Sequence, residues 1–422
     1  MVRGRFVHNL TVRNKIIMQM LRIEQKFTHA PLADVKGAVI SELERMQAQG
    51  LIRSGERVAV GVGSRGVDNT ALVIKTLIDF LKDSGNYPFI VPAMGSHGGA
   101  TAEGQKAIMA SYGITEQSMG VKIEAGTETV NLGRTAEHGV PVYVYKPAYE
   151  ADLVIPVNRI KVHTDYKGPI ESGIHKMLAI GLGNLAGASS LHTYGSARSF
   201  HWLIPEVGQF LAHNIPFRFG LGLVEDSYDQ TAAVRALPLE TLYEEEHKLL
   251  EWSRTMLPRF LMPEFDILVV ERFGKDISGA GMDPNIVGRT SIPGSIPFPG
   301  PRFQYCVVLD LTEGAHGNAA AISCADIITR RFFDKIDLQA TYQNCLACHN
   351  PHAAKIPVIA DDEEAAIDMA CEICTDLTSE DGKPRIVRIK DTLHMGEILV
   401  SPNMWNEIKD IPGITLLGPA EV

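Results

Sequence analysis

The densest chemistry in the sequence lies in one stretch where ionisable side chains alternate with apolar residues and glycines. Its members are Arg159, Lys161, His163, Asp165, Lys167, Glu171, His175, Lys176 and His192. So many ionisable groups cannot all face a core. A further histidine, His97, lies in a separate glycine-rich loop. Imidazole titrates near neutral pH without help, so histidines brought together from different loops predict proton transfer on both faces of a substrate.

Two cations stand out beside these histidines. Lys176 precedes the apolar run 177–180, where desolvation would lower the pKa of the amine and make it nucleophilic. The alternative for Lys176 is a surface lysine whose stem lies along apolar neighbours. Arg65 follows Gly63-Ser64, and its planar guanidinium can hold a carboxylate through two parallel hydrogen bonds. Together these residues predict an enzyme that acts on a small anionic substrate, but they do not fix the reaction.

The elements that must position these residues form a βαβ pattern. An apolar strand over 57–62 is followed by the glycine-rich turn 63–66, a helix over 69–83 and a strand over 88–92. This order favours a parallel sheet. The polar loop 94–101 then lies where a strand ends, which is where open α/β sheets bind ligands.

The same style continues along the chain and predicts two α/β domains with largely parallel sheets. Pro258 and Pro263 interrupt the chain, so we expect an N-terminal domain over 1–262 that carries most site residues and a C-terminal domain over 263–422. The active site is expected in the cleft between the domains, which the second domain closes. Further strands are predicted at 140–145, 153–157, 217–224, 265–270, 305–311, 386–389 and 397–400, and helices at 34–48, 102–112, 239–256, 325–344 and 362–377.

Composition excludes several classes of protein. The 422 residues include 40 Lys+Arg and 50 Asp+Glu, a net charge of −10, which argues against a nucleic-acid partner. No apolar run is long enough to cross a membrane, and the first residues lack the apolar core of a secretory signal. Six cysteines are too few for a disulfide framework. The sequence therefore predicts a cytoplasmic protein.

The cysteines leave alternatives open. Cys345-x-x-Cys348-His349 matches a haem-attachment pattern, but that chemistry belongs to exported proteins. A second pair, Cys371-x-x-Cys374, is separated from the first by 22 residues, so the four thiols could form a structural zinc site. Since no turn residues shape either pair into a zinc knuckle, we expect buried or partly exposed thiols instead.

Taken in order, the motifs resemble those of the lactate racemase superfamily, whose members use a nickel-pincer nucleotide cofactor. The resemblance rests on Gly63-Ser64-Arg65-Gly66, Gly95-Ser96-His97-Gly98-Gly99, Arg159-Ile160-Lys161-Val162-His163, Ser172-Gly173-Ile174-His175-Lys176-Met177 and His192, and it extends into 274–279 and 281–285. It covers most of the chain. The ordered set is specific, whereas any one motif is not.

The resemblance implies a role for each residue of the site. The assignments are His192 as nickel ligand, Lys176 as the cofactor anchor by a thioamide link or a charge contact, Ser96 and Gly98 as cofactor-binding loop residues, His97 and His163 as paired bases, and Arg65 as carboxylate clamp. Backbone amides of such a loop can also hold the single phosphate of a mononucleotide.

The implied reaction inverts C2 of a 2-hydroxy acid. One imidazole takes the hydroxyl proton while hydride leaves C2 for the cofactor, and hydride then returns to the other face of the planar 2-keto acid. The expected partners are a small anionic 2-hydroxy acid and cofactor-assembly proteins, with a homo-oligomer possible. The lactate enzymes carry an acidic residue where this chain has Val62 and a glycine pair where it has Ile174-His175. A larger, polyhydroxylated acid such as an aldonate therefore fits at least as well as lactate.

Two other functions use the same residues. Lys176 could form a Schiff base, with the histidines as general acid and base, which would make the protein an aldolase or a dehydratase. A non-enzymatic protein could instead use the histidines and cysteines only to hold a metal or a cofactor.

Overall fold

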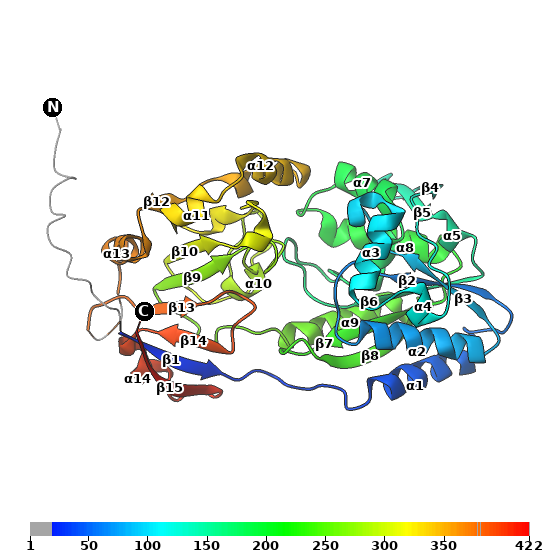
Figure 1. Ribbon diagram of the computed structural model, residues 1–422, viewed down its shortest axis with the longest axis horizontal. Helices are drawn as coiled ribbons and strands as arrows, with labels where there is room; N and C mark the ends of the chain where they lie inside the picture. The colour runs from blue at the N-terminus through cyan, green and yellow to red at the C-terminus, as the bar shows by residue number, and fades with distance from the viewer. Residues whose placement is uncertain (1–18, 378, 380, 422) are drawn as a thin grey trace.

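The computed structural model describes residues 19–377, 379 and 381–421, which form two large sheets with helices packed on both faces and one two-stranded sheet. Figure 1 shows the two sheets side by side, each in its own half of the molecule. None of the described helices combines the length and the apolar composition that crossing a membrane requires.

The first sheet carries the predicted βαβ unit. Its strands in spatial order are β3 (Tyr87–Pro92), β2 (Arg57–Val62), β6 (Leu153–Arg159), β7 (Phe219–Glu225) and β8 (Thr231–Pro238). All neighbours are parallel except β7 and β8. In β2, Val58 and Val60 enter one core cluster and Ala59 the other, because successive strand residues point to opposite faces. Both faces of the sheet are therefore buried.

Helices cover the two faces of this sheet. On one side α1 (Val35–Ala48) buries Val35, Val39, Leu43 and Met46 at helical spacing. The same core includes residues of α2 (Thr70–Asp83), α3 (Ala102–Ser111) and α4 (Glu116–Met119), and the opposite core includes residues of α5 (Lys146–Tyr149), α6 (Ile174–Lys176), α7 (Asn184–Tyr194), α8 (Phe200–Asn214) and α9 (Leu242–Thr255). A hairpin of β4 (Thr129–Arg134) and β5 (Pro141–Tyr145) packs on that second side.

The second sheet has eight strands. Their order is β12 (Val358–Ala360), β11 (Ile327–Thr329), β10 (Tyr305–Leu311), β9 (Ile267–Phe273), β13 (Ile386–Ile389), β14 (Glu397–Val400), β1 (Gln19–Gln25) and β15 (Ile414–Glu421). The strands from β12 to β13 are parallel, and the last three pair antiparallel. Its helices are α10 (Pro284–Val287), α11 (Arg330–Asp334), α12 (Leu338–Ala347), α13 (Glu363–Ile373) and α14 (Trp405–Ile408). The prediction of largely parallel sheets is confirmed.

The position of β1 differs from the predicted division of the chain. The sequence predicts one N-terminal domain over 1–262, but β1 lies between β14 and β15 of the second sheet (Figure 1). Arg22 pairs with Leu399 on one side and with Gly418 on the other. The strand fits there because Met20 and Ile23 point into the two cores of that sheet.

Most predicted elements are present, with one clear error. Strands 57–62, 305–311, 386–389 and 397–400 have the predicted bounds. The helix predicted over 325–344 is wrong, because its first part is strand β11 followed by the separate helices α11 and α12. Ile327 and Ile328 are buried in the sheet beside β10. Two β-branched apolar residues flanked by buried strands are better placed in a sheet than in a helix.

Candidate functional site

The register of the first sheet brings three polar loops to one edge. Val62 at the end of β2 pairs with Pro92 of β3 and with Val157 of β6. Because these strands are parallel, the chain leaves all three at the same edge of the sheet. The loops that follow carry Arg65, His97 and His163, so the predicted residues start from neighbouring strands.

His97 is held by a neighbouring loop. Its Nδ1 forms a short hydrogen bond with Ser64 Oγ, from the loop that carries Arg65. Partial burial and the positive charges of Arg65 and Lys176 lower the pKa of His97. Where Ser64 accepts this hydrogen bond from Nδ1–H, Nε2 keeps a lone pair and can take a proton. His97 is therefore suited to act as a base near neutral pH.

The loop around His97 depends on one glycine. Gly98 has a φ of 67°, and a Cβ atom there would lie 2.7 Å from the backbone nitrogen of Gln105. Only glycine allows this close approach of the loop to the start of α3. The backbone amides of Ser96 and Gly98 donate to no acceptor among the described residues, so they are available to an anion.

His163 makes more contacts than His97, and these contacts define its tautomer. Its backbone amide donates to Glu171 Oε2 at 2.6 Å, and its Nδ1 accepts from the amide of Asp165 at 3.0 Å. The ring stacks on Tyr166 with centroids 4.3 Å apart. Burial, followed by the charges of Lys176 and other nearby cations, holds the pKa of His163 well below its usual value. The neutral ring therefore carries its proton on Nε2 and donates from that atom.

The second half of the chain touches this loop. Asn285 Nδ2 donates to the carbonyl of His163 at 3.1 Å, and the Lys167 ammonium contacts Asn285 Oδ1. The same ammonium lies 4.7 Å from the ring centre of Phe298. The 283–298 region thus fixes the backbone beside His163 from across the molecule.

Lys176 ends α6 and is followed by a π-helical turn over Met177–Gly181. Such turns are rare and frequently occur at functional sites. Burial lowers the pKa of Lys176 to about 8, an effect that the negative charge of Asp165 opposes and the charge of Arg65 reinforces. A substantial fraction of this amine is therefore neutral near physiological pH.

His175, adjacent to Lys176, has a structural role. It is fully buried, and its Nδ1 lies 2.8 Å from Glu246 Oε2 while its Nε2 lies 2.9 Å from the Gln209 amide nitrogen. Both ring nitrogens are occupied by protein partners. His175 therefore stays outside the reactive set.

His192 lies on α7 with an exposed ring that meets Phe200 edge to face at 5.2 Å. Partial burial, then the charges of His349 and Lys176, lower the pKa of His192. Lys176 thus acts on the pKa values of His97, His163 and His192 alike. The Lys176 amine is therefore near enough to influence all three predicted imidazoles.

Positive charge at this edge is only partly neutralised. Arg159 forms a short ion pair with Glu225, but the side chains of Arg65, Lys161 and Lys176 form no hydrogen bond or ion pair with any described residue. Burial, followed by the charge of Arg159, lowers the pKa of Lys161 to about 8. Cations placed together at a cost in electrostatic energy indicate a site for an anion.

Sequence reasoning missed three supporting residues. Ser64 and Glu171 lie within recognisable motifs, but nothing in their spacing shows that they hold His97 and His163. Asn285 lies 122 residues from its partner His163, so no local signal marks the pair.

The four-thiolate zinc alternative is wrong. Among the described residues, only Glu137, His138 and Glu206 bring three metal-ligating atoms close together, and the two cysteine pairs do not. That trio is partly exposed, and His138 Nδ1 pairs with Glu206 at 2.7 Å. No disulfide joins the six cysteines. Cys306, Cys324 and Cys345 are buried, Cys371 and Cys374 are partly buried, and Cys348 is exposed.

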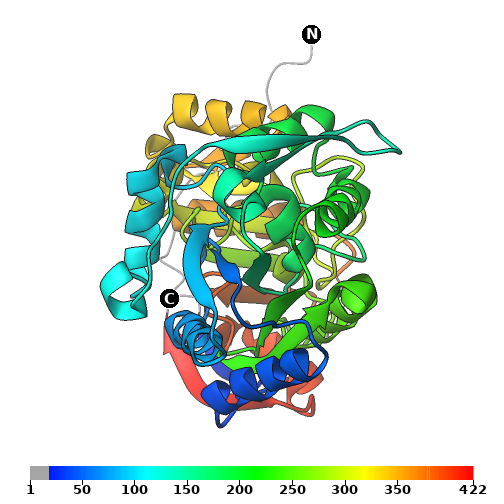
Figure 2. The same ribbon diagram turned by 90° about the vertical axis from the view of Figure 1, so that its right-hand side faces the viewer.

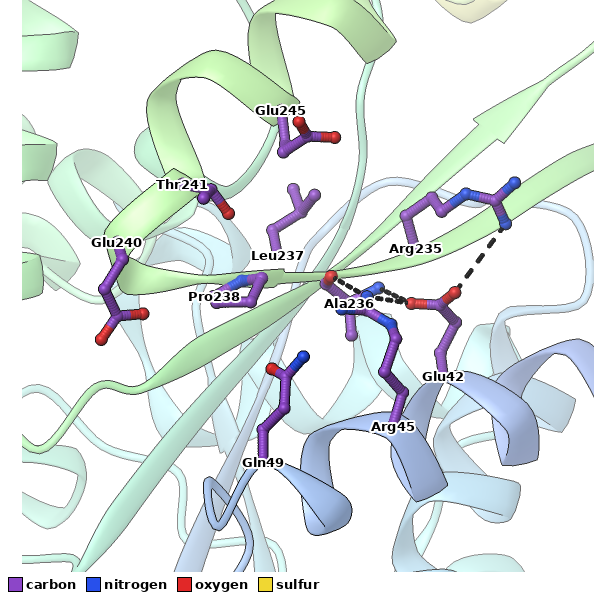
Figure 3. Close-up of a pocket in the computed structure, with 10 residues that line it drawn as sticks. All are labelled: Glu42, Arg45, Gln49, Arg235, Ala236, Leu237, Pro238, Glu240, Thr241 and Glu245. Carbon is purple, nitrogen blue, oxygen red and sulfur yellow. Dashed lines mark hydrogen bonds and ion pairs between the residues drawn. The ribbon is translucent and has the colours of Figure 1, made fainter.

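A surface hollow between α1 and β8 contains none of the predicted residues (Figure 3). Its charged groups satisfy one another: Arg45 donates to Glu42 Oε2 at 2.5 Å and to the Ala236 carbonyl at 2.7 Å. We assign no ligand to it.

Comparison with known proteins supports the resemblance seen in the sequence. Residues 4–193 match the family model of the lactate racemase N-terminal domain. The fold is similar to the lactate racemase apoprotein from Thermoanaerobacterium thermosaccharolyticum, with a TM-score of 0.51 and 14% sequence identity over 89% of this chain and 99% of that chain. The match supports the lactate racemase superfamily for residues 4–193.

The matched part of the chain includes Arg65, His97, His163, Lys176 and His192. A protein of Thermotoga maritima is also similar, with a TM-score of 0.52 and 13% identity over 88% of this chain and 99% of that chain. At such identities the structural likeness shows the fold alone. No curated protein has a significant sequence match to the chain. The match to the lactate racemase N-terminal domain supports an isomerase of the racemase or epimerase type.

Proposed function

We propose that the protein is a nickel-pincer nucleotide-dependent racemase or epimerase that inverts C2 of a 2-hydroxy acid. The observation that carries this proposal is that Arg65, His97 and His163 follow three adjacent parallel strands at one sheet edge. The charge of Lys176 also lowers the pKa values of His97, His163 and His192. Proton-handling groups and a carboxylate receptor are what such a reaction requires from the protein.

The residues fit the cofactor in three respects. The unbonded amides of Ser96 and Gly98 suit its phosphate, and the exposed imidazole of His192 suits nickel. The Lys176 amine, with a pKa of about 8, is reactive enough for a covalent link and otherwise supplies a charge contact. When bound, the cofactor supplies reversible hydride acceptance and return at C2.

The chain itself supplies orientation and proton transfer. Arg65 holds the substrate carboxylate through two parallel hydrogen bonds. His97, whose Nε2 is free when Ser64 accepts from Nδ1–H, takes the 2-hydroxyl proton from one isomer. His163 serves the other isomer. To take a proton at Nε2, its ring must first lose the Nε2 proton to solvent, gain a proton at Nδ1 and give up the hydrogen bond from the Asp165 amide. The direction of reaction that uses His163 as the base therefore requires a rearrangement at that histidine, and the direction that uses His97 does not.

The substrate we propose is a 2-hydroxy acid larger than lactate, such as an aldonate. In this chain the Ser64 hydroxyl is hydrogen-bonded to His97, and Val62 stands where the lactate enzymes carry an acidic residue. This difference from the lactate enzymes is the reason for proposing another substrate. We expect the enzyme to work in the cytoplasm, where its six thiols stay reduced, and to receive its cofactor from assembly proteins.

The test is production of the protein together with cofactor-assembly enzymes, followed by intact mass and nickel analysis and a screen of 2-hydroxy acids in deuterated water. Hydride return predicts that the original hydrogen stays at C2. Solvent deuterium at C2 would overturn the proposal, because it indicates deprotonation and re-protonation of carbon.

Variants sharpen this test. Arg65→Lys should lower kcat/KM by roughly tens-fold, because an ammonium cannot reproduce the planar fork. Each variant is supplied with each pure C2 isomer in turn. His97→Ala should allow a single turnover with one isomer only, and His163→Ala with the other isomer only. Unimpaired steady-state turnover by either variant would remove that histidine from the mechanism.

A second candidate function rests on the lowered pKa of Lys176. A partly neutral lysine can form a Schiff base with a carbonyl substrate, as in an aldolase or dehydratase. Borohydride trapping with substrate would label Lys176 in that case. A racemase would give no trapped adduct.

A further inference from the structure

One cation at the edge of the first sheet, Lys161, has no part in the function proposed above. Its backbone amide donates to the Ser172 carbonyl at 3.1 Å, so the main chain is fixed there. Its side chain is exposed and forms no hydrogen bond or ion pair with any described residue. The ammonium group is therefore available to a ligand.

The direction of the Lys161 side chain follows from the extended chain beyond β6, where Lys161 forms an isolated bridge with Ser172. Ile160 and Val162 are both buried in the core on one face of the sheet. Successive residues of an extended chain point to opposite sides, so Lys161 points away from that core, as does the proposed base His163. Lys161 and His163 are therefore presented on the same side of the chain.

The register of the sheet relates Lys161 to Arg65. Val62 of β2 pairs with Val157 of β6. Arg65 comes three residues after Val62, and Lys161 comes four residues after Val157. The two cations therefore leave the same edge of the sheet from adjacent parallel strands, after a similar length of chain.

The second half of the chain borders the same place. Asn285 Nδ2 donates at 3.1 Å to the carbonyl of His163, two residues beyond Lys161. Asp283, the nearby acidic residue of that segment, already accepts from the backbone and side-chain nitrogens of Asn285, both at 2.8 Å. Figure 2, seen from the side of the first half, shows the second half in yellow to red behind it. Lys161 thus lies where the two halves meet.

The surroundings of Lys161 are those of a cleft. Its side chain is accessible to solvent, yet the surrounding chain displaces enough water to lower its pKa to about 8, and the charge of Arg159 lowers it further. The charges of Asp283 and Asp229 oppose this shift, but neither carboxylate forms an ion pair with Lys161. A protruding surface lysine would keep its hydration.

Two cations without protein partners at one edge are matched by two anionic groups. Arg65 is assigned to the C1 carboxylate, which leaves Lys161 for a second charge. An ammonium is a compact point charge that suits either a carboxylate or a phosphate. We propose that Lys161 is a specificity-determining residue that binds a second anionic group of the substrate, which is then a sugar acid charged at both ends. The inference rests on the proposed function, which assigns Arg65 to C1.

The experiment is titration calorimetry on the full chain produced together with cofactor-assembly enzymes. The probes are gluconate, glucarate and 6-phosphogluconate, which share one carbon chain and differ in the group at C6. We expect glucarate or 6-phosphogluconate to bind at least about ten-fold more tightly than gluconate, because each can gain a charge-assisted hydrogen bond. The acid that gains affinity identifies the second group as a carboxylate or a phosphate.

Variants assign this preference to one side chain. Lys161→Met keeps the length of the side chain without its charge and should remove the preference, whereas Lys161→Arg should keep most of it. Lys409→Met is the matched control, because Lys409 is an exposed lysine directly after α14, in the second half (Figure 1). This control should keep the preference. Thermal unfolding of each variant checks that the fold is intact.

Three results would overturn the inference. They are equal or absent binding of the three acids by the parent protein, an unchanged preference in Lys161→Met, and loss of nickel from Lys161→Met. The last result would assign the lysine to the cofactor instead of the substrate.

The two proposals fail separately. If the doubly charged acids bind in a manner that depends on Lys161 but solvent deuterium enters C2, the second anionic group stands and the hydride mechanism does not. If a 2-hydroxy acid is inverted with its hydrogen retained while no preference for a second charge is found, the proposed function stands without this inference.

Discussion

The lowered pKa of Lys176 can be measured directly. An ordinary lysine has a pKa near 10.5, so about 0.3% of it is neutral at pH 8, whereas half of Lys176 is neutral there if its pKa is about 8. The difference is more than a hundred-fold in the reactive amine. Trace labelling with acetic anhydride between about pH 6 and pH 11, read by peptide mass spectrometry, gives this fraction for every lysine.

Labelling of Lys176, normalised to its own plateau, should reach half near pH 8, well below the midpoint of exposed lysines in the same sample. Variants of neighbouring charges fix the cause. Removing the cation in Arg65→Gln should raise the midpoint, and removing the anion in Asp165→Asn should lower it, because Arg65 disfavours and Asp165 favours the charged amine.

The control is Arg53→Gln, which removes an exposed arginine bonded only to the Gly50 carbonyl among the described residues. It should leave the midpoint of Lys176 unchanged. A midpoint equal to that of exposed lysines, or one that Arg65→Gln does not move, would refute the reasoning that burial and neighbouring charge tune this amine.

Other predictions concern the residues that support the site. Ser64→Ala should lower kcat about ten-fold with little change in KM, because His97 loses one orienting hydrogen bond, and Ser64→Thr should retain most activity; equal kcat values would contradict this. Glu246→Ala should destabilise the fold by about 3 kcal/mol in urea unfolding, since it leaves the buried His175 without its carboxylate partner; an unchanged midpoint would refute the structural role. Gly98→Ala should cost about 1–3 kcal/mol and weaken binding of a pyridine mononucleotide, measured by calorimetry, and normal binding would argue against the loop as phosphate site.

Much of the first sheet could be predicted because its signals are local. The apolar strand 57–62 and the glycine turn after it fix both an element and its end, and the structure has them at the predicted bounds. The helix predicted over 325–344 failed because Ile327 and Ile328 are buried by neighbouring strands that no local pattern shows. Tertiary context there overrides periodicity.

For the candidate site, too, the sequence predicts some features, and only the packing of the folded chain shows the others. His97, His163 and Lys176 could be predicted from the sequence as candidate site residues, because titratable groups in an apolar stretch are unusual. What each one does depends on partners far along the chain. His175 belongs to the same cluster by sequence, yet Glu246, 71 residues later, makes it structural. Only packing distinguishes a reactive histidine from one that holds the core.

The placement of β1 has a consequence for how the chain acquires its structure. Arg22 of β1 pairs with Leu399. During synthesis β1 is made early, but its partner strands are made only when the chain is nearly complete. The first sheet, 57–238, can form in the meantime, because all its strands lie within that interval. Closing so long a loop is slow, because the chain loses conformational entropy before the stabilising contacts between the strands form. The final docking of β1 between β14 and β15 would therefore be a late step in synthesis, and an exposed β1 would be a point where two nascent chains could exchange strands.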